Sequence, residues 1–189
     1  MIYIGIDPDM QQNGVCCLNK TGASISFVAG TKTNAQLYDM LQLYATKYEK
    51  PNIQVTVEAG WLNRSNWHLT RYDNVRTAAA KGYDVGCNHQ RGKDIVEWCQ
   101  HNGYKVQEQK PLVKVWQTAD GKVSVKELQS IVGQYGIKLP KPCPQDMRDA
   151  ILLTWLAAGL PIRVMPSVSK QVYDKSQKAR QAAKKHGNI

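Results

Sequence analysis

Apolar residues alternate with polar or small ones at the start of the chain. Residues 2–7 read Ile-Tyr-Ile-Gly-Ile-Asp, and this period of two predicts a strand with one buried face. Residues 14–18 and 24–29 predict two further strands, separated from their neighbours by short polar turns. Residues 34–48 then repeat apolar positions at helical spacing, with Asn34 as the expected N-cap.

The rest of the chain mixes helices and strands. The elements predicted there are a strand over 52–60, a helix over 88–102, a strand over 104–109, a helix over 124–133 and a helix over 145–159. Ser124 and Glu127 have the spacing of a capping box, and Gly103 and Gly159 are natural helix terminators. The polar stretch over 61–86 has no clear period. A strand meander followed by alternating strands and helices predicts an α/β fold with a mixed sheet.

Composition is that of one globular domain. The 189 residues are 42% hydrophobic and 21% charged, which is ordinary for a chain with a single core. No apolar run is long enough to span a bilayer and no leader precedes the first strand, so we expect a cytoplasmic location. The five cysteines lack C-x-x-C spacing, and the Cys-x-His pairs at 87–89 and 99–101 fit no zinc pattern.

The net charge of +10 is concentrated in two segments. Residues 61–93 carry six basic and two acidic side chains, and residues 163–189 carry seven and one, so these segments supply +4 and +6. A basic excess confined in this way favours a polyanionic partner. The segment 163–189 is equally compatible with a solvated, unfolded end.

Four acidic residues stand out by position. Asp7 and Glu58 end apolar strands that we expect to be neighbours, and Asp146 and Asp149 are three residues apart at the start of the last helix. Each has a simpler role when taken alone: a turn residue, a solvent-reaching strand end, a complement to the helix dipole, or a surface partner of Arg148. Taken together, they predict four carboxylates at one edge of the sheet.

Such a cluster needs a cation, because like charges at close range raise one another's pKa. Hard oxygen ligands without His or Cys suit Mg²⁺ or Mn²⁺. Two such ions cleave phosphodiesters in many nucleases, and basic segments elsewhere would hold the nucleic-acid backbone.

With this set of residues, the chain resembles the RuvC-type Holliday junction resolvases of the RNase H-like nuclease superfamily. The matching segments are GIDPDMQQNGVCCL, VTVEAG and QDMRDAILLTWLAAGLP, in that order. The resemblance covers residues 1–162, which it makes the nuclease domain, and leaves 163–189 as a basic tail. It implies a mixed five-stranded sheet flanked by helices. It also implies a homodimer that binds branched DNA and resolves four-way junctions by paired phosphodiester hydrolysis, without a small-molecule cofactor.

The resemblance also assigns roles to residues. It makes Asp7, Glu58, Asp146 and Asp149 the ligands of two Mg²⁺ ions, for which Mn²⁺ can substitute. In RNase H the second acid lies on the first helix, whereas Glu58 ends a strand, and this favours DNA junctions over RNA–DNA hybrids. The chain departs from the family at Asp9, where glycine is usual and which we do not expect to be a ligand. It departs again at Met147 and Arg148, between the last two acids, where small residues are usual.

The substrate contacts are expected mainly after Glu58, where aromatic and basic residues interleave. The predicted DNA-binding residues are Arg64, Trp67, His68, Arg71, Tyr72, Arg76, Lys81, Arg91, Lys93, Lys122 and Lys126. The resemblance places a lysine beside the scissile phosphate, with Lys114 as the first choice and Lys122 or Lys126 as alternatives. The tryptophans of this segment could instead fill a small core, Trp61 more readily than Trp67.

Three alternatives remain open at this level. The same chemistry could act on flaps, forks or hybrids, or the chain could bind junctions without cutting them. A sugar kinase or actin-like ATPase shares the first hairpin pattern, but that fold needs two such domains and 189 residues supply only one. The helix over 88–102 could mediate dimerisation or pack on its own sheet.

Overall fold

The computed structural model describes residues 1–63, 73–113, 116, 118 and 121–162. The helices and strands of this part are β1 (Ile2–Asp7), β2 (Asn13–Thr21), β3 (Ser24–Lys32), α1 (Asn34–Tyr48), β4 (Ile53–Glu58), α2 (Val75–His101), β5 (Lys105–Gln109), α3 (Val125–Val132) and α4 (Gln145–Ala157). The expected mixed five-stranded α/β fold is confirmed, because the strands form one sheet in the order β3-β2-β1-β4-β5.

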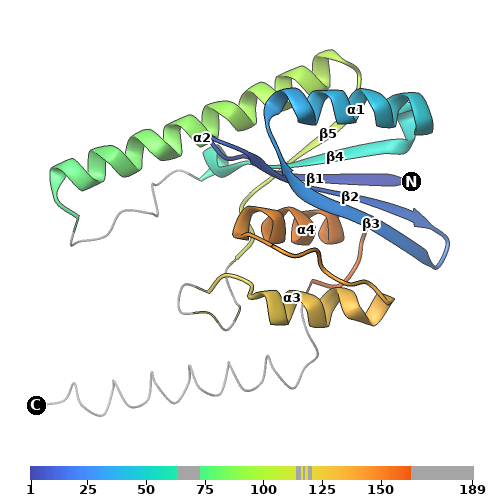
Figure 1. Cartoon of the computed structure of the whole chain (residues 1–189). Coiled ribbons are helices and arrows are strands. Elements are labelled where there is room, and N and C mark those ends of the chain that lie inside the picture. The colour runs from blue at the N-terminus through green and yellow to red at the C-terminus, as the bar shows by residue number, and fades with distance from the viewer. Residues whose placement is uncertain (64–72, 114–115, 117, 119–120, 163–189) are drawn as a thin grey trace, which may run out of the picture.

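The first three strands form an antiparallel meander, and β4 and β5 extend the sheet in parallel with β1. Figure 1 shows the layers: α1 and α2 cover one face of the sheet, α4 covers the other, and α3 lies beyond α4. The order puts β1 and β4 side by side near the centre. The predicted neighbourhood of the strands that carry Asp7 and Glu58 is therefore confirmed.

The period of two in β1 sorts its side chains between two cores. Ile2, Ile4 and Ile6 belong to the core on the α1 and α2 side. The alternate residues face α4: Tyr3 packs on that second core, and a Cβ added to Gly5 would lie 2.6 Å from the carbonyl oxygen of Ala150 in α4. Because the alternation continues, Asp7 belongs to the α4 face of the sheet.

Helix α4 packs directly on the middle of the sheet, as predicted from its apolar residues. Its buried side chains include Ile151, Leu152 and Trp155. A hydrogen bond from the Thr154 hydroxyl to the carbonyl of Cys16, 3.2 Å long, ties the helix to β2. A side chain at Gly14 of β2 would overlap the carbonyl of Asp146, so glycine there lets the start of α4 approach the sheet.

The predicted start of the helix over 88–102 was wrong. Helix α2 begins at Val75, after an N-cap at Asn74 whose side chain accepts a 2.9 Å hydrogen bond from the backbone N–H of Thr77. Gly82 and Gly86 interrupt the apolar period in its first half, and for this reason the first half of the helix was not predicted from the sequence. The buried residues of α2 all lie in its second half and are Gly92, Ile95, Val96 and Cys99. Figure 1 shows the first half projecting beyond the sheet.

Smaller predictions had mixed outcomes. The capping box of Ser124 and Glu127 is confirmed, but Thr33 rather than Asn34 caps α1. Asn34 instead accepts a 2.8 Å hydrogen bond from the side chain of Asn13. All five cysteines are free thiols, and no helix in the described ranges is long and apolar enough to cross a membrane.

Candidate functional site

Two acidic residues meet where β1 and β4 end. The parallel register pairs Ile6 with Val57, so the next residue on each strand, Asp7 and Glu58, comes side by side. Both side chains belong to the α4 face, because Ile6 and Val57 are buried in the opposite core. The sheet therefore delivers two half-buried carboxylates to one edge.

The start of α4 brings two more carboxylates to the same place. Asp146 lies in the first turn and Asp149 one turn later on the same side. The side-chain amide of Gln145 donates a 2.7 Å hydrogen bond to Asp149 Oδ1 and so fixes that carboxylate. Arg148 is not available to an acid or a phosphate there, because it donates to the carbonyls of Val123 and Cys143 and to the side chain of Gln145.

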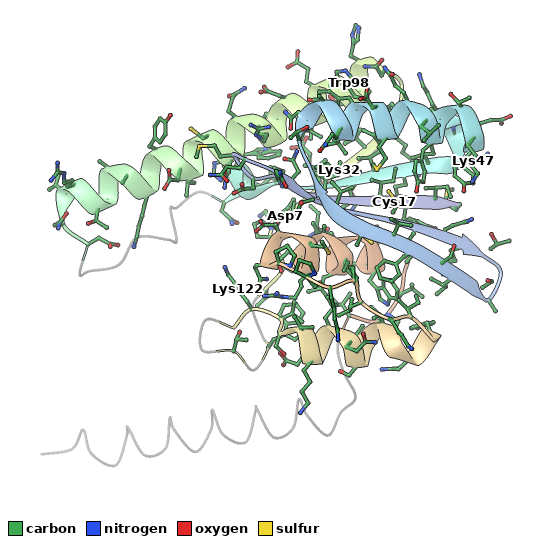
Figure 2. The ribbon with its side chains drawn as sticks, in the orientation of Figure 1. Asp7, Cys17, Lys32, Lys47, Trp98 and Lys122 are labelled. Carbon is green, nitrogen blue, oxygen red and sulfur yellow. The ribbon has the colours of Figure 1, made fainter. Side chains whose placement is uncertain are left out.

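These residues surround a pocket of about 240 Å³. Its lining consists of Asp7, Pro8, Asp9, Glu58, Gly60, Trp61, Val85, Asn88, His89, Pro111, Leu112, Trp116, Lys122, Gln145, Asp146 and Asp149. In Figure 2, Asp7 and Lys122 lie near the same end of α4, and both line the pocket. All four predicted acids thus border one cavity, and Asp9 joins them.

Burial and mutual repulsion dominate the electrostatics of the pocket. Burial, followed by the charges of Glu58, Asp149, Asp146 and Asp9, raises the pKa of Asp7 well above its usual range. The pKa of Asp146 and that of Asp149 are also raised, in both cases mainly by burial. Lys122 opposes this rise at Asp146 and Asp149 and is the only lysine or arginine among the described lining residues.

The carboxylates line the pocket but are not clustered around a single point. Within the described ranges, no three His, Cys, Asp or Glu side chains are grouped closely enough to enclose a metal ion. The case for a cation therefore rests on the donor set and on the surplus of negative charge. Both fit a hard divalent cation, because the acids offer only oxygen ligands and an added positive charge would relieve the repulsion at Asp7.

Helix α2 forms another wall of the pocket and contacts the segments that follow Asp7 and Glu58. The His89 ring meets Trp61 edge to face, with 6.2 Å between ring centroids, and a Cβ on Gly60 would lie 2.7 Å from His89 Nε2. Burial and then the charge of Lys93 lower the pKa of His89. Arg91 donates a 2.6 Å hydrogen bond to the carbonyl of Met10, in the turn that follows Asp7.

Of the two roles that the sequence left open for Trp61, the core role is confirmed. Its ring packs on the core beneath α1 and α2 and also lines the pocket. Its indole N–H donates a 2.8 Å hydrogen bond to Glu108 Oε2 of β5. Trp61 is thus a core residue that presents part of its surface to the cavity.

The predicted DNA-binding residues are dispersed. Lys122 lines the pocket, whereas Arg76, Lys93 and Lys126 are exposed away from its lining. Arg91 holds the turn after Asp7, and Lys81 forms a 2.8 Å ion pair with Asp73 before α2. The predicted residues Arg64, Trp67, His68, Arg71, Tyr72 and Lys114 lie outside the described residues.

Sequence reasoning missed several lining residues. Asn88 and His89 were placed at a helix start, although the Asn74 cap signal could have put them in the middle of a longer helix. Asp9, which we do not expect to be a ligand, borders the pocket and raises the pKa of both Asp7 and Asp146. No sequence signal pointed to Trp116 or to Gln145.

No family model matches this chain, and no curated protein sequence does so. Solved structures do match it. RuvC of Thermus thermophilus in complex with a Holliday junction substrate aligns with a TM-score of 0.51 and 18% identity, over 84% of this chain and 93% of that chain. A second Thermus thermophilus RuvC structure aligns with a TM-score of 0.48 and 17% identity, over 87% of this chain and 100% of that chain. A Fowlpox virus resolvase in complex with Holliday junction DNA aligns with a TM-score of 0.42 and 13% identity, over 84% of this chain and 97% of that chain.

The strand order and the helices on both faces define an RNase H-like α/β fold. Within that class, the chain has the fold of RuvC over most of its length.

Proposed function

We propose that this chain is a metal-dependent, structure-specific endonuclease that resolves four-way DNA junctions. The observation that carries the proposal is the pocket itself. Four carboxylates from β1, β4 and α4 border one cavity in a chain with a net charge of +10. Carboxylates gathered in a basic chain are the combination that metal-assisted cleavage of a polyanion requires.

The ligands of the cations would be Asp7, Glu58, Asp146 and Asp149. Two Mg²⁺ or Mn²⁺ ions held by these carboxylates would supply activation of water and neutralisation of charge at a phosphodiester. Asp7 is the central ligand of the proposal, because its pKa is raised by the charge of each of the other three. Gln145 orients Asp149 through the hydrogen bond to Oδ1.

Lys122 would hold the substrate phosphate at the mouth of the pocket. Its charge opposes the rise in the pKa of both acids on α4, so its ammonium group lies within electrostatic reach of their carboxylates. A cation in that position stabilises the negative charge that develops on the phosphoryl oxygens. Lys114, the first choice from the sequence, stays a proposal for the same role.

The substrate is proposed to be branched DNA. The Thermus thermophilus RuvC whose fold this chain shares was solved with a Holliday junction substrate, and this supports a junction as the ligand. Arg76 and Lys93 of α2 and Lys126 of α3 are exposed and would contact phosphates outside the pocket. The segment 64–72 would add its aromatic and basic residues there.

We further propose that the active form is a homodimer of the nuclease domain 1–162, with the basic tail 163–189 as an accessory DNA contact. Paired cuts on opposite strands need two pockets related by symmetry. The exposed first half of α2 offers surface for this contact, with Val75 and Tyr83 exposed by 87% and 69%. The apolar residues Ile95, Val96 and Cys99 do not, since they are buried in the chain's own core.

A substrate panel tests the proposal. End-labelled four-way junctions, flaps, forks, linear duplexes and RNA–DNA hybrids are incubated with the full chain in Mg²⁺, in Mn²⁺ and in EDTA. We expect cleavage of the four-way junction at paired, symmetric positions in either metal and none in EDTA. Equal cleavage of junction and linear duplex would contradict junction selectivity, and binding without cleavage in either metal would contradict the nuclease assignment.

A further inference from the structure

One wall of the pocket is made by a face of α2 that the proposed metal chemistry does not use. Val85, Asn88 and His89 line the cavity from this helix, at the spacing that puts them on one side of it. They face the carboxylates of β1, β4 and α4 across the same space. A group large enough to fill the pocket therefore contacts both the acids and this wall.

Asn88 carries an unsatisfied polar atom in this wall. Its side-chain oxygen Oδ1 is buried and has no hydrogen-bond partner in the described part of the chain. Buried amide oxygens are nearly always paired, because an unpaired one loses its interaction with water and gains nothing in return. Asn88 is one of the residues that line the pocket, and five of the other lining side chains are carboxylates, which cannot donate to this oxygen when they are ionised. A donor from a ligand would satisfy it.

The lining of the pocket also includes apolar and aromatic side chains. Among them are Trp61, Pro111, Leu112 and Trp116, and the one polar atom of the Trp61 side chain is already used by Glu108. Gly92 leaves room for the Trp61 ring, since a Cβ there would lie 2.9 Å from its Cη2. Aromatic and apolar surfaces of this kind accept the face of a nucleobase.

We propose that Asn88 reads the base of the nucleotide that flanks the scissile phosphate. This inference rests on the proposed nuclease function and adds a specificity residue to it. With the phosphate at the carboxylates and Lys122, the adjoining base lies against the tryptophan wall and its edge meets the Asn88 amide. An asparagine amide offers an acceptor and a donor side by side, which matches N6 and N7 of adenine. Adenine is therefore the preferred base, and thymine, which has no exocyclic amino group, is the least favoured.

Cleavage rates on matched junctions test this inference. After the cut positions of the wild type are mapped, each nucleotide that flanks the cut is changed in turn to each of the four bases. We expect adenine at one flanking position to be cut about five-fold or more faster than thymine, as one amide–base pair provides. Equilibrium binding of the same four junctions, measured in Ca²⁺ buffer, is expected to rank the bases in the same order.

Three variants separate the possible outcomes. Asn88→Ala should bring the four rates together, and Asn88→Asp, which keeps only acceptors, should favour cytosine over adenine. Gln90→Ala is the control, because this amide on the same helix bonds to Asp94 outside the pocket and should leave the preference as in the wild type.

Three results would overturn the inference: equal rates for all four bases in the wild type, a preference that survives in Asn88→Ala, or a rise in the Mg²⁺ requirement of Asn88→Ala by the same factor at every base. The last result would make Asn88 a cation ligand. If the chain cuts no junction, the proposed function is refuted. The order of binding affinities for the four junctions in Ca²⁺ buffer then tests the role of Asn88 independently.

Discussion

At the residue scale, the pocket is a destabilising feature of the fold. Asp7 is half-buried among four other acids, so its ionised form is disfavoured in the folded chain. Functional sites commonly hold groups whose pKa is displaced in this way. The carboxylates stay close together despite this unfavourable free energy, because the strand register and the close contact of α4 determine where they lie.

Asp7→Asn should therefore stabilise the metal-free protein at neutral pH. The folded state holds the Asp7 proton at a pH where the unfolded chain, with an ordinary pKa of about 3.9, has lost it. Stability is thus lost as pH rises above that value, and the variant escapes this loss. In EDTA at pH 7 we expect the melting temperature to rise, by about 2–4 °C for each kcal/mol of relieved repulsion.

Thermal unfolding of both proteins between pH 3.5 and pH 8 checks this prediction. The advantage of the variant should be absent at the acid end and should grow as pH rises. Asp39→Asn, which removes an exposed carboxylate on α1, is the control and should show no such trend. A variant that is less stable than the wild type at pH 7 in EDTA would contradict this view of the pocket.

At the element scale, the site depends on how closely α4 lies against the meander. Gly14 of β2 sits under the Asp146 backbone, and Gly5 of β1 sits under Ala150, so the helix rests on bare strand backbone. Both glycines are in strands, where they carry a propensity cost, and the close approach explains their presence.

Gly14→Ala should move the start of α4 and lower stability. The new methyl would overlap the Asp146 carbonyl, and overpacking of this kind costs about 1–3 kcal/mol. Gly30→Ala in β3 is the matched control, because a Cβ there meets no atom within 4 Å. Urea denaturation of the two variants measures the difference, and equal midpoints would show that α4 is not held by this contact.

The sequence predicted most elements, and the failures have physical causes. The strands around Asp7 and Glu58 were predictable because alternation records which face is buried, and α4 was predictable from its apolar residues. The start of α2 was predicted too late because its first half projects beyond the sheet and contains none of the fully buried residues of the helix, which leaves no apolar period to detect. The Thr33 cap was missed because Asn34 is an equally good capping residue.

At the scale of the whole molecule, the pocket joins parts that are distant in the sequence. Its acidic side was predictable, because strand ends and a helix start can be located one at a time. Its other wall was not, because Asn88, Leu112 and Trp116 meet the acids only through tertiary packing. The chain has the fold of RuvC over most of its length, and the wall of α2 is where this chain's own specificity is proposed to lie.

The most direct test of the central claim compares cutting with binding in single-carboxylate variants. Cleavage of a labelled four-way junction in Mg²⁺ and its binding in EDTA are measured for the wild type, Asp7→Asn, Asp146→Asn and the control Asp39→Asn. The account predicts that the two pocket variants lose cleavage by at least about a hundred-fold, as loss of a key charge-stabilising group in an active site does, while they bind the junction as the wild type does. Asp39→Asn should cut normally. Undiminished cleavage by Asp7→Asn and Asp146→Asn would contradict the assignment of this pocket as the nuclease centre.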